Sequence, residues 1–173
     1  MYTSETTSQA KGVMVSHHNI VSAIADQAQT ISFISEAAAY IGYLPLAHIL
    51  ELDTELTCLS RGCRIGYSSP TTLHDCAIKI SPGTRGDCTA LQPTLMTAVS
   101  AIMGRIFKIV FRRTRALLGG RLRAVLSGGA PLNPETQRFM NICMLCKATD
   151  SRRPVDVEAL PTGTVGPPVR CAK

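Results

Sequence analysis

The sequence contains no tryptophan, and aromatic residues make up only 5% of its 173 residues. Proteins that bind single-stranded nucleic acid stack bases on aromatic side chains beside a basic groove, so this shortage argues against such a protein. A long apolar run is missing as well. The longest stretch, Ala37–Leu50, is interrupted by Pro45 and His48 and falls short of the roughly 20 residues of a membrane-spanning helix. We expect no transmembrane segment in this chain.

A secretory signal, with a basic start and an apolar centre, is also absent from the sequence. The seven cysteines are odd in number and scattered, which favours a reducing compartment over a disulfide framework. Cys143 and Cys146 form a single CxxC pair on a predicted apolar helix, without a second pair or a nearby histidine. Because a structural zinc site needs four ligands, we expect two buried thiols here and no metal site.

Acidic side chains are missing between Asp87 and Glu135, in a chain whose net charge is +6. Seven basic residues fall in this stretch, namely Arg105, Lys108, Arg112, Arg113, Arg115, Arg121 and Arg123. Such a block either forms a solvated helix face or contacts the phosphates of nucleic acid, a cofactor or lipid headgroups. A basic nucleic-acid-binding protein is the weakest of these alternatives, because no groove-reading motif accompanies the charge.

The residues that are present suit one globular domain, since 45% are hydrophobic and 17% are charged. Ser16 is the predicted N-cap of a helix that places Ile20, Ile24 and Ala28 on one face. Further along, the pattern predicts strands at 38–44, 63–67, 89–91 and 122–126, and helices at 46–59, 94–110 and 135–145. This alternation indicates an α/β fold, a mostly parallel sheet flanked by helices, in which ligands bind at the carboxyl ends of strands.

The opening stretch YTSETTSQAKG, from Tyr2 to Gly12, is rich in hydroxyl groups and ends in a lysine and a glycine. A loop that wraps phosphates needs inward N–H groups, hydroxyl donors, a cation and glycines that allow close approach. The stretch supplies most of these groups but lacks the pattern GxxxxGK[ST], so it is not a Walker-type loop. Taken by itself, such a stretch is more often a flexible terminus.

Two later motifs give the opening stretch a context. YLPLAHILE spans Tyr43–Glu51, and SGGAPL spans Ser127–Leu132. In this order, behind the opening stretch, they resemble the long-chain fatty acid–CoA ligases of the adenylate-forming superfamily. The resemblance extends from Tyr2 to Cys146 through CRIGYSSP, QPTLM, RALLGG and TQRFMNIC, and TGTVGPPV at Thr162–Val169 is similar to a later family segment.

The resemblance implies a partial adenylate-forming N-terminal domain over residues 1–146 and an irregular, proline-rich tail over 147–173. The implied activity is the ATP-dependent joining of a long-chain fatty acid to CoA through an acyl-adenylate, with Mg2+ as the metal. The implied phosphate ligands are Thr3, Ser4, Thr6, Thr7, Lys11 and Gly12, and the adenine and acyl-adenylate would contact Ser127, Gly128, Gly129, Ala130 and Pro131. His48 would border the acyl and pantetheine passage.

Several of these residues also have a purely structural interpretation. His48 lies on a predicted apolar helix, where a packed, hydrogen-bonded histidine needs no ligand. Gly128 and Gly129 also suit a plain turn from strand to helix. Glu51 lies one helical turn before Glu55, a spacing compatible with a surface pair.

The chain departs from the family pattern in the phosphate loop itself. Where the family has two glycines and a proline, this sequence has Glu5, Ser8 and Ala10. The carboxylate of Glu5 would repel phosphates, and a residue other than glycine at positive φ costs on the order of 1–2 kcal/mol. We therefore expect a lowered affinity for ATP.

Larger parts of the family pattern are also expected to be missing. The sequence lacks a helical insertion between Val110 and Phe111, the acidic Tyr-Gly-x-Thr-Glu motif after Cys146, and the family's N-terminal anchor, ribose-binding aspartate, hinge and C-terminal domain. Adenylation needs the acid, the loop and the closing domain together, so we expect an inactive fragment.

The alternative to an inactive ligase fragment is a non-catalytic binding or regulatory fragment that keeps an acyl or nucleotide surface. Intact relatives are expected at the endoplasmic reticulum or another organelle membrane. This chain, expressed alone, is expected in the cytoplasm, where its basic residues allow peripheral contact with an anionic membrane surface.

Overall fold

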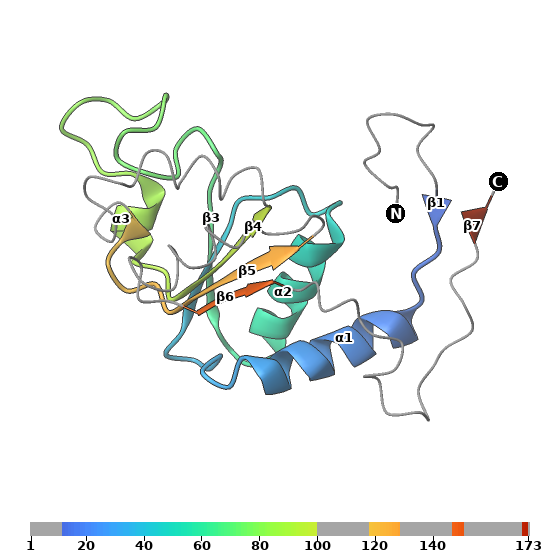
Figure 1. The fold of residues 1–173 in the computed structure, drawn as a ribbon. Helices are drawn as coiled ribbons and strands as arrows, with labels where there is room; N and C mark the ends of the chain where they lie inside the picture. The colour runs from blue at the N-terminus through green and yellow to red at the C-terminus, as the bar shows by residue number, and fades with distance from the viewer. Residues whose placement is uncertain (1–11, 100–117, 129–146, 151–170, 173) are drawn as a thin grey trace.

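A five-stranded sheet forms the centre of the computed structural model, which describes residues 12–99, 118–128, 147–150 and 171–172 (Figure 1). The strands of this sheet are β2 (Ala39–Gly42), β3 (Arg64–Tyr67), β4 (Leu95–Val99), β5 (Ala124–Gly128) and β6 (Lys147–Asp150). They lie in the order β3-β2-β4-β5-β6, and every neighbouring pair is parallel. The predicted α/β fold with a mostly parallel sheet is therefore confirmed, and the carboxyl ends of its strands lie at one end of the sheet.

Three helices and a small second sheet complete the described fold. The helices are α1 (His17–Thr30), α2 (Ile49–Ser60) and α3 (Asp87–Leu91), and β1 (Gly12–Val13) pairs antiparallel with β7 (Cys171–Ala172). Figure 1 shows the β1–β7 pair apart from the main sheet, with α2 beside the sheet and α1 outside α2. Within the described residues, no helix is long and apolar enough to cross a membrane.

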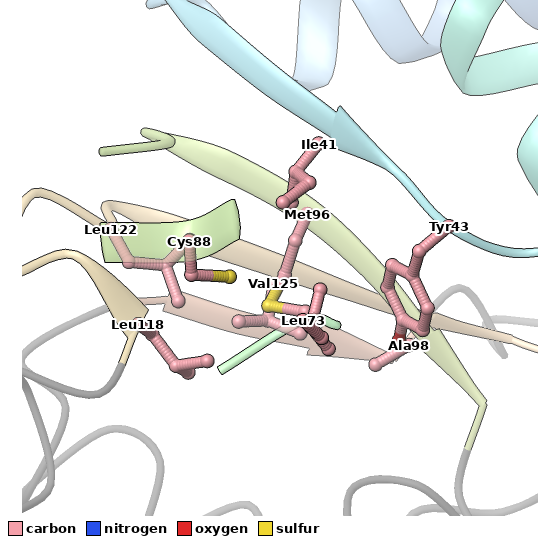
Figure 2. Close-up of a cluster of buried hydrophobic side chains, with 9 residues drawn as sticks. All are labelled: Ile41, Tyr43, Leu73, Cys88, Met96, Ala98, Leu118, Leu122 and Val125. Atoms are coloured by element: carbon pink, nitrogen blue, oxygen red, sulfur yellow. The ribbon is translucent and has the colours of Figure 1, made fainter. Parts of the chain in front are cut away.

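Both faces of the main sheet are apolar, and different segments cover them. Because side chains alternate along a strand, Tyr40 and Leu95 point to one face while Ile41 and Met96 point to the other. The first face packs against Cys58 of α2. The second face forms the buried cluster of Figure 2, made of Ile41, Tyr43, Leu73, Cys88, Met96, Ala98, Leu118, Leu122 and Val125. Burial on both faces explains the continuous apolar sequence of these strands.

Helix α1 begins where the sequence predicts it. Ser16 is the N-cap, and its hydroxyl accepts a hydrogen bond from the Asn19 N–H at 3.1 Å while the Asn19 side chain accepts from the Ser16 N–H at 3.1 Å. At the other end of the helix, the Gln27 amide donates to Asp53 Oδ2 at 3.1 Å. The helix is therefore fixed by its cap at one end and by α2 at the other.

Two predicted elements have the wrong type. The stretch Thr94–Val110 was expected to be a helix, but its described part contains strand β4, and the expected strand Thr89–Leu91 belongs to helix α3. Residues 95–99 are almost fully buried and pair with β2 on one side and β5 on the other, so sheet hydrogen bonds decide their conformation. Gln92, at φ 52°, ends α3 and turns the chain into β4.

Other predicted elements differ in their limits. Helix α2 begins at Ile49 rather than Leu46, because Pro45 and His48 form a turn in which the His48 N–H donates to the Pro45 carbonyl at 2.8 Å. The segment after Cys146 was predicted to be irregular, but its first four residues form β6 through parallel pairing with β5. Where the domain ends stays a prediction. The predicted helix 135–145, with Cys143 and Cys146, lies outside the described residues.

Candidate functional site

The carboxyl end of the parallel sheet holds two of the predicted site residues. Ser127 and Gly128 are the last residues of β5, where they lie opposite Ala98 and Val99 of β4. Ser127 is fully buried. Ligands of open parallel sheets bind at this end of the strands, so the structure places both residues where such a site is expected. The other three residues of this predicted group, Gly129, Ala130 and Pro131, lie outside the described residues.

His48 reaches the same end of the sheet by another route. It follows the carboxyl end of β2 and is the N-cap of α2, rather than a residue within an apolar helix as the sequence suggested. The imidazole is half-buried, and its Nδ1 accepts a hydrogen bond from the Leu50 N–H at 3.3 Å. A neutral imidazole that accepts at Nδ1 carries its proton at Nε2, which leaves Nε2 as a donor.

The opening stretch is represented in the described residues only by its end. Gly12 is the first residue of β1 and pairs with Ala172 of β7. Thr3, Ser4, Thr6, Thr7 and Lys11 lie outside the described residues, as do Glu5 and Ser8. Their part in phosphate binding stays a prediction.

A buried polar network, which the sequence analysis did not find, links α2 to the central strands. The Thr97 hydroxyl donates to Glu51 Oε2 at 2.7 Å, and the oxygens of Tyr40 and Thr97 are 2.8 Å apart. Either hydroxyl can be the donor in the second bond. Tyr40, Thr97 and Glu51 therefore form one chain of hydrogen bonds from β2 through β4 to α2.

Glu51 lies at the acceptor end of this network and is fully buried, so it is not part of a surface pair. Burial raises the pKa of its carboxyl, opposed by the hydrogen bond from Thr97. Among the described residues, no group bonds to its second oxygen, Oε1. A Cβ on Gly42 would lie 2.9 Å from that oxygen, so a larger residue at the end of β2 would require the Glu51 carboxyl to shift. Glu55 is also buried, and it accepts a hydrogen bond from the Tyr67 hydroxyl at 3.1 Å.

Tyr43 adds another buried polar group after β2. Figure 2 shows its ring beside Ala98, on the face opposite to Tyr40. Its hydroxyl is buried, has no hydrogen-bond partner among the described residues, and has a pKa raised by burial. The start of the YLPLAHILE motif is thus packed into the sheet, and only its middle part reaches toward the ligand end.

The fit of these residues to a metal ion is poor. In the part of the chain that the structure describes, no group of three or more His, Cys, Asp or Glu side chains could hold a metal. Glu51 and Glu55 are buried and engaged by hydroxyl donors, so they do not form an open carboxylate site. We derive no step through Mg2+ from these residues.

Residues 1–151 of the sequence match the family model of the AMP-binding enzymes. The chain belongs to the AMP-binding enzyme family. Among the curated AMP-binding relatives is long chain acyl-CoA synthetase 8 of Arabidopsis thaliana, which is 34% identical and matches 99% of this chain but 31% of its own length. Long-chain-fatty-acid–CoA ligase 2 of Schizosaccharomyces pombe is 32% identical over 83% of this chain and 26% of its own. The chain thus spans about a third or less of these relatives.

Solved structures of other proteins share the fold. VinN in complex with L-aspartate superposes with a TM-score of 0.65 at 17% identity, covering 85% of this chain and 34% of VinN. The fatty acyl-adenylate ligase of L. pneumophila, in complex with acyl adenylate and pyrophosphate, has a TM-score of 0.63 at 20% identity, covering 84% of this chain and 25% of its own. Identities this low establish the fold and nothing finer.

The alignment to the Arabidopsis relative also shows a difference in length within the matched part. It extends over 225 positions, more than the whole 173-residue chain. Part of the relative must therefore lie opposite gaps in this sequence. This AMP-binding chain is therefore shorter than the corresponding part of that synthetase.

Proposed function

We propose that this chain carries the nucleotide-binding and acyl-binding core of a long-chain fatty acid–CoA ligase. The observation that supports the proposal is that Ser127 and Gly128, at the end of β5, and His48, after β2, lie at the same end of the parallel sheet, the end at which ligands bind. The relatives named long-chain acyl-CoA synthetase or ligase supply the substrate class.

The proposed reaction has two steps. The fatty carboxylate attacks the α-phosphorus of ATP, so that a carboxylate–phosphorus bond forms and pyrophosphate leaves with the electrons of the broken bond. The CoA thiol, after losing its proton, then attacks the acyl carbon and expels AMP. What a protein supplies to such steps is chiefly positioning and stabilisation of charge.

Residues of this chain are assigned to that task within the proposal. Backbone beside Ser127 and Gly128 would approach the adenine and the acyl-adenylate, because a glycine lets a ligand come close to the strand end. His48 would offer its Nε2 proton beside the acyl and pantetheine passage. Thr3, Ser4, Thr6, Thr7 and Lys11 would hold the ATP phosphates, with Mg2+ and CoA as further family ligands.

The 173-residue chain is proposed to bind rather than to turn over substrate. Glu5 and Ser8 stand where the family has glycines, and the chain is shorter than its Arabidopsis relative within the matched part. A purified chain should therefore show no fatty acid-dependent exchange between ATP and pyrophosphate. Detectable exchange would contradict this part of the proposal.

Binding tests the site itself. A non-hydrolysable long-chain acyl-AMP analogue, titrated into the chain in a calorimeter, should bind saturably, and a flat trace would contradict the proposed function. His48→Ala should weaken binding by about tenfold, the effect of one lost hydrogen bond to a charged ligand. Ser16→Ala is the matched control, because it also removes a helix N-cap but lies in front of α1. Equal losses in the two variants would count against a role for His48.

The finer assignments belong to the same proposal. Fatty acid, ATP and CoA are the proposed ligands, and fatty acid metabolism at the endoplasmic reticulum or another organelle membrane is the proposed context. Fractionation of cells expressing the chain, compared with a long-chain ligase of the same cells, would test the location.

A further inference from the structure

A cavity lies at the opposite end of the sheet from Ser127 and Gly128. It has a volume of about 360 Å³, and its lining, apart from two alanines, comes from Phe33, Ser35, Thr94, Gly120, Arg121 and Arg123. These residues precede β2, β4 and β5, so the cavity opens at the amino ends of the three central strands. The parallel strands therefore separate this cavity from the ligand end.

The two arginines give the cavity its charge. The Arg123 guanidinium lies 4.4 Å from the centroid of the Phe33 ring, a cation–π contact that limits the freedom of the side chain. Its backbone is also fixed, because the Arg123 N–H donates to the Thr94 carbonyl at 2.8 Å. Among the described residues, neither arginine pairs with a carboxylate, and no acidic side chain lines the cavity.

Smaller groups complete the lining. Gly120 has φ +73°, and no atom of the described residues lies within 4 Å of the position that its Cβ would take, so the backbone there is open toward the cavity. Within the same described residues, the Ser35 hydroxyl donates only to the Phe33 carbonyl, at 3.5 Å, and can turn toward a bound group. Ala37 and Ala38 supply an apolar wall.

We propose that this cavity binds a small organic oxyanion, a phosphate or carboxylate attached to a compact apolar group. A guanidinium fork binds such an anion through two parallel hydrogen bonds, and stacking on Phe33 prepares the fork of Arg123. The volume is at the lower end of the range for small-molecule sites. Because the arginines line a concavity with an apolar wall, the shape favours a small ligand over a flat membrane surface.

Phenyl phosphate titrated into the full chain tests the proposal, with backbone amide shifts recorded by NMR. The amides of Ser35 and Gly120 should shift in a saturable way. Arg123→Gln should weaken the affinity by about tenfold or more, since it removes both the charge and the stacked fork. Arg121→Gln, which leaves the stacking intact, should weaken it by a smaller factor, and Arg64→Gln on the exposed edge of β3 is the matched control.

Three results would overturn the proposal. One is the absence of saturable shifts at Ser35 and Gly120 with either phenyl phosphate or inorganic phosphate. Another is an equal loss of affinity in Arg64→Gln and Arg121→Gln, which would indicate binding by general charge. The third concerns lipid vesicles. If Arg121→Gln leaves phenyl phosphate binding unchanged but reduces sedimentation of the chain with phosphatidylglycerol vesicles, and not with phosphatidylcholine vesicles, the arginines bind a lipid surface.

The experiment is independent of the ligase proposal. Arg121→Gln should leave binding of the acyl-AMP analogue unchanged, because Arg121 lies at the other end of the sheet. Thermal unfolding of each variant shows whether it is folded, and Arg121→Gln is expected to fold because the Arg121 side chain is exposed. The proposed binding of an oxyanion in the cavity and the proposed function as a ligase core can therefore be refuted separately.

Discussion

Glu51 shows how much depends on a single residue. A carboxyl group that is fully buried, bonded through one oxygen to Thr97 and without a hydrogen-bond partner among the described residues at the other, is poorly solvated as an anion. Its raised pKa follows from that burial. Its surroundings therefore favour the protonated acid at this position.

The variant Glu51→Gln tests whether Glu51 is protonated in the folded chain. A raised folded-state pKa means that the stabilising contribution of Glu51 is complete below its unfolded pKa and is lost as pH rises through the folded pKa. Glutamine accepts the Thr97 bond and does not titrate. Denaturant unfolding should therefore show a difference within about 1 kcal/mol at low pH, and a growing advantage for the variant as pH rises.

Two further variants serve as controls for the pH dependence of Glu51→Gln. Glu36→Gln, at an exposed site, should keep the wild-type dependence on pH. Glu51→Ala leaves Thr97 without its acceptor and should cost about 1–3 kcal/mol. A Glu51→Gln profile parallel to that of the wild type would show that the pKa of Glu51 is the same in the folded and the unfolded chain, which would contradict the raised pKa.

Sequence reasoning missed the role of Glu51 for a physical reason. The spacing of Glu51 and Glu55 is the same for a solvated pair and for two buried carboxyls, and only the strand partners Tyr40 and Thr97 distinguish them. His48 was predicted as a site residue from its motif, but its position as an N-cap depends on the turn at Pro45.

At the scale of elements, the close approach of α3 to the segment before β5 depends on Gly119. Its φ is +79°, and a Cβ there would lie 2.3 Å from the Cys88 carbonyl oxygen of α3. Gly120 has nearly the same φ, +73°, but nothing within 4 Å of its Cβ position. A comparison of Gly119 with Gly120 therefore distinguishes the cost of backbone strain, which both positions have, from the cost of a steric clash, which only Gly119 has.

Alanine at each position should give different losses of stability. Gly120→Ala should cost about 1–2 kcal/mol from the left-handed conformation alone. Gly119→Ala should cost about 3 kcal/mol or more, because the clash with α3 backbone adds to the same strain. Free energies of unfolding from urea titrations measure both, and equal losses would show that α3 moves aside freely.

Elements with a strong local signal were predicted correctly. The capping residues Ser16 and Asn19 mark α1 in the sequence itself, and short apolar runs marked β2 and β5. The runs around β4 and α3 carry no such marker, since an apolar run of five residues suits either conformation. Their types follow from the pairing of β4 with β2 and β5, which is tertiary information.

At the scale of the whole molecule, the sheet has a protected centre and an exposed side. β2 and β4 are buried along almost their entire length, whereas β3 is an edge strand with exposed ends. Ile41 and Met96 lie in the buried cluster of Figure 2, while Ile65 of β3 is only partly buried. Local opening should therefore begin at β3.

Hydrogen exchange of the backbone amides measures how stability differs between the central strands and β3. We expect the amides of Ile41 and Met96 to exchange at least about tenfold more slowly than that of Ile65, because the central strands open only with the whole sheet. Peptide-level mass spectrometry over residues 39–42, 64–67 and 95–99 is sufficient. Equal protection in the three peptides would contradict a stable centre.

The sequence predicts the residues at one end of the sheet better than those at the other. The family motifs singled out Ser127 and His48 as site residues, and the structure shows both at the carboxyl end of the sheet. The arginine cavity at the other end joins residues near 33, 94 and 121, and no local pattern connects segments so far apart in the chain. Only the strand order brings them together.

The parallel pairing of β4 with β5 has a consequence for how such a chain tolerates loss of sequence. A parallel pair needs a connection of about a dozen residues or more, and here residues 100–123 make it. A crossover can therefore shed residues down to that minimum while the register from Leu95 opposite Ala124 stays the same. The number of residues between two parallel strands can therefore change while the pairing of the strands in the sheet stays the same.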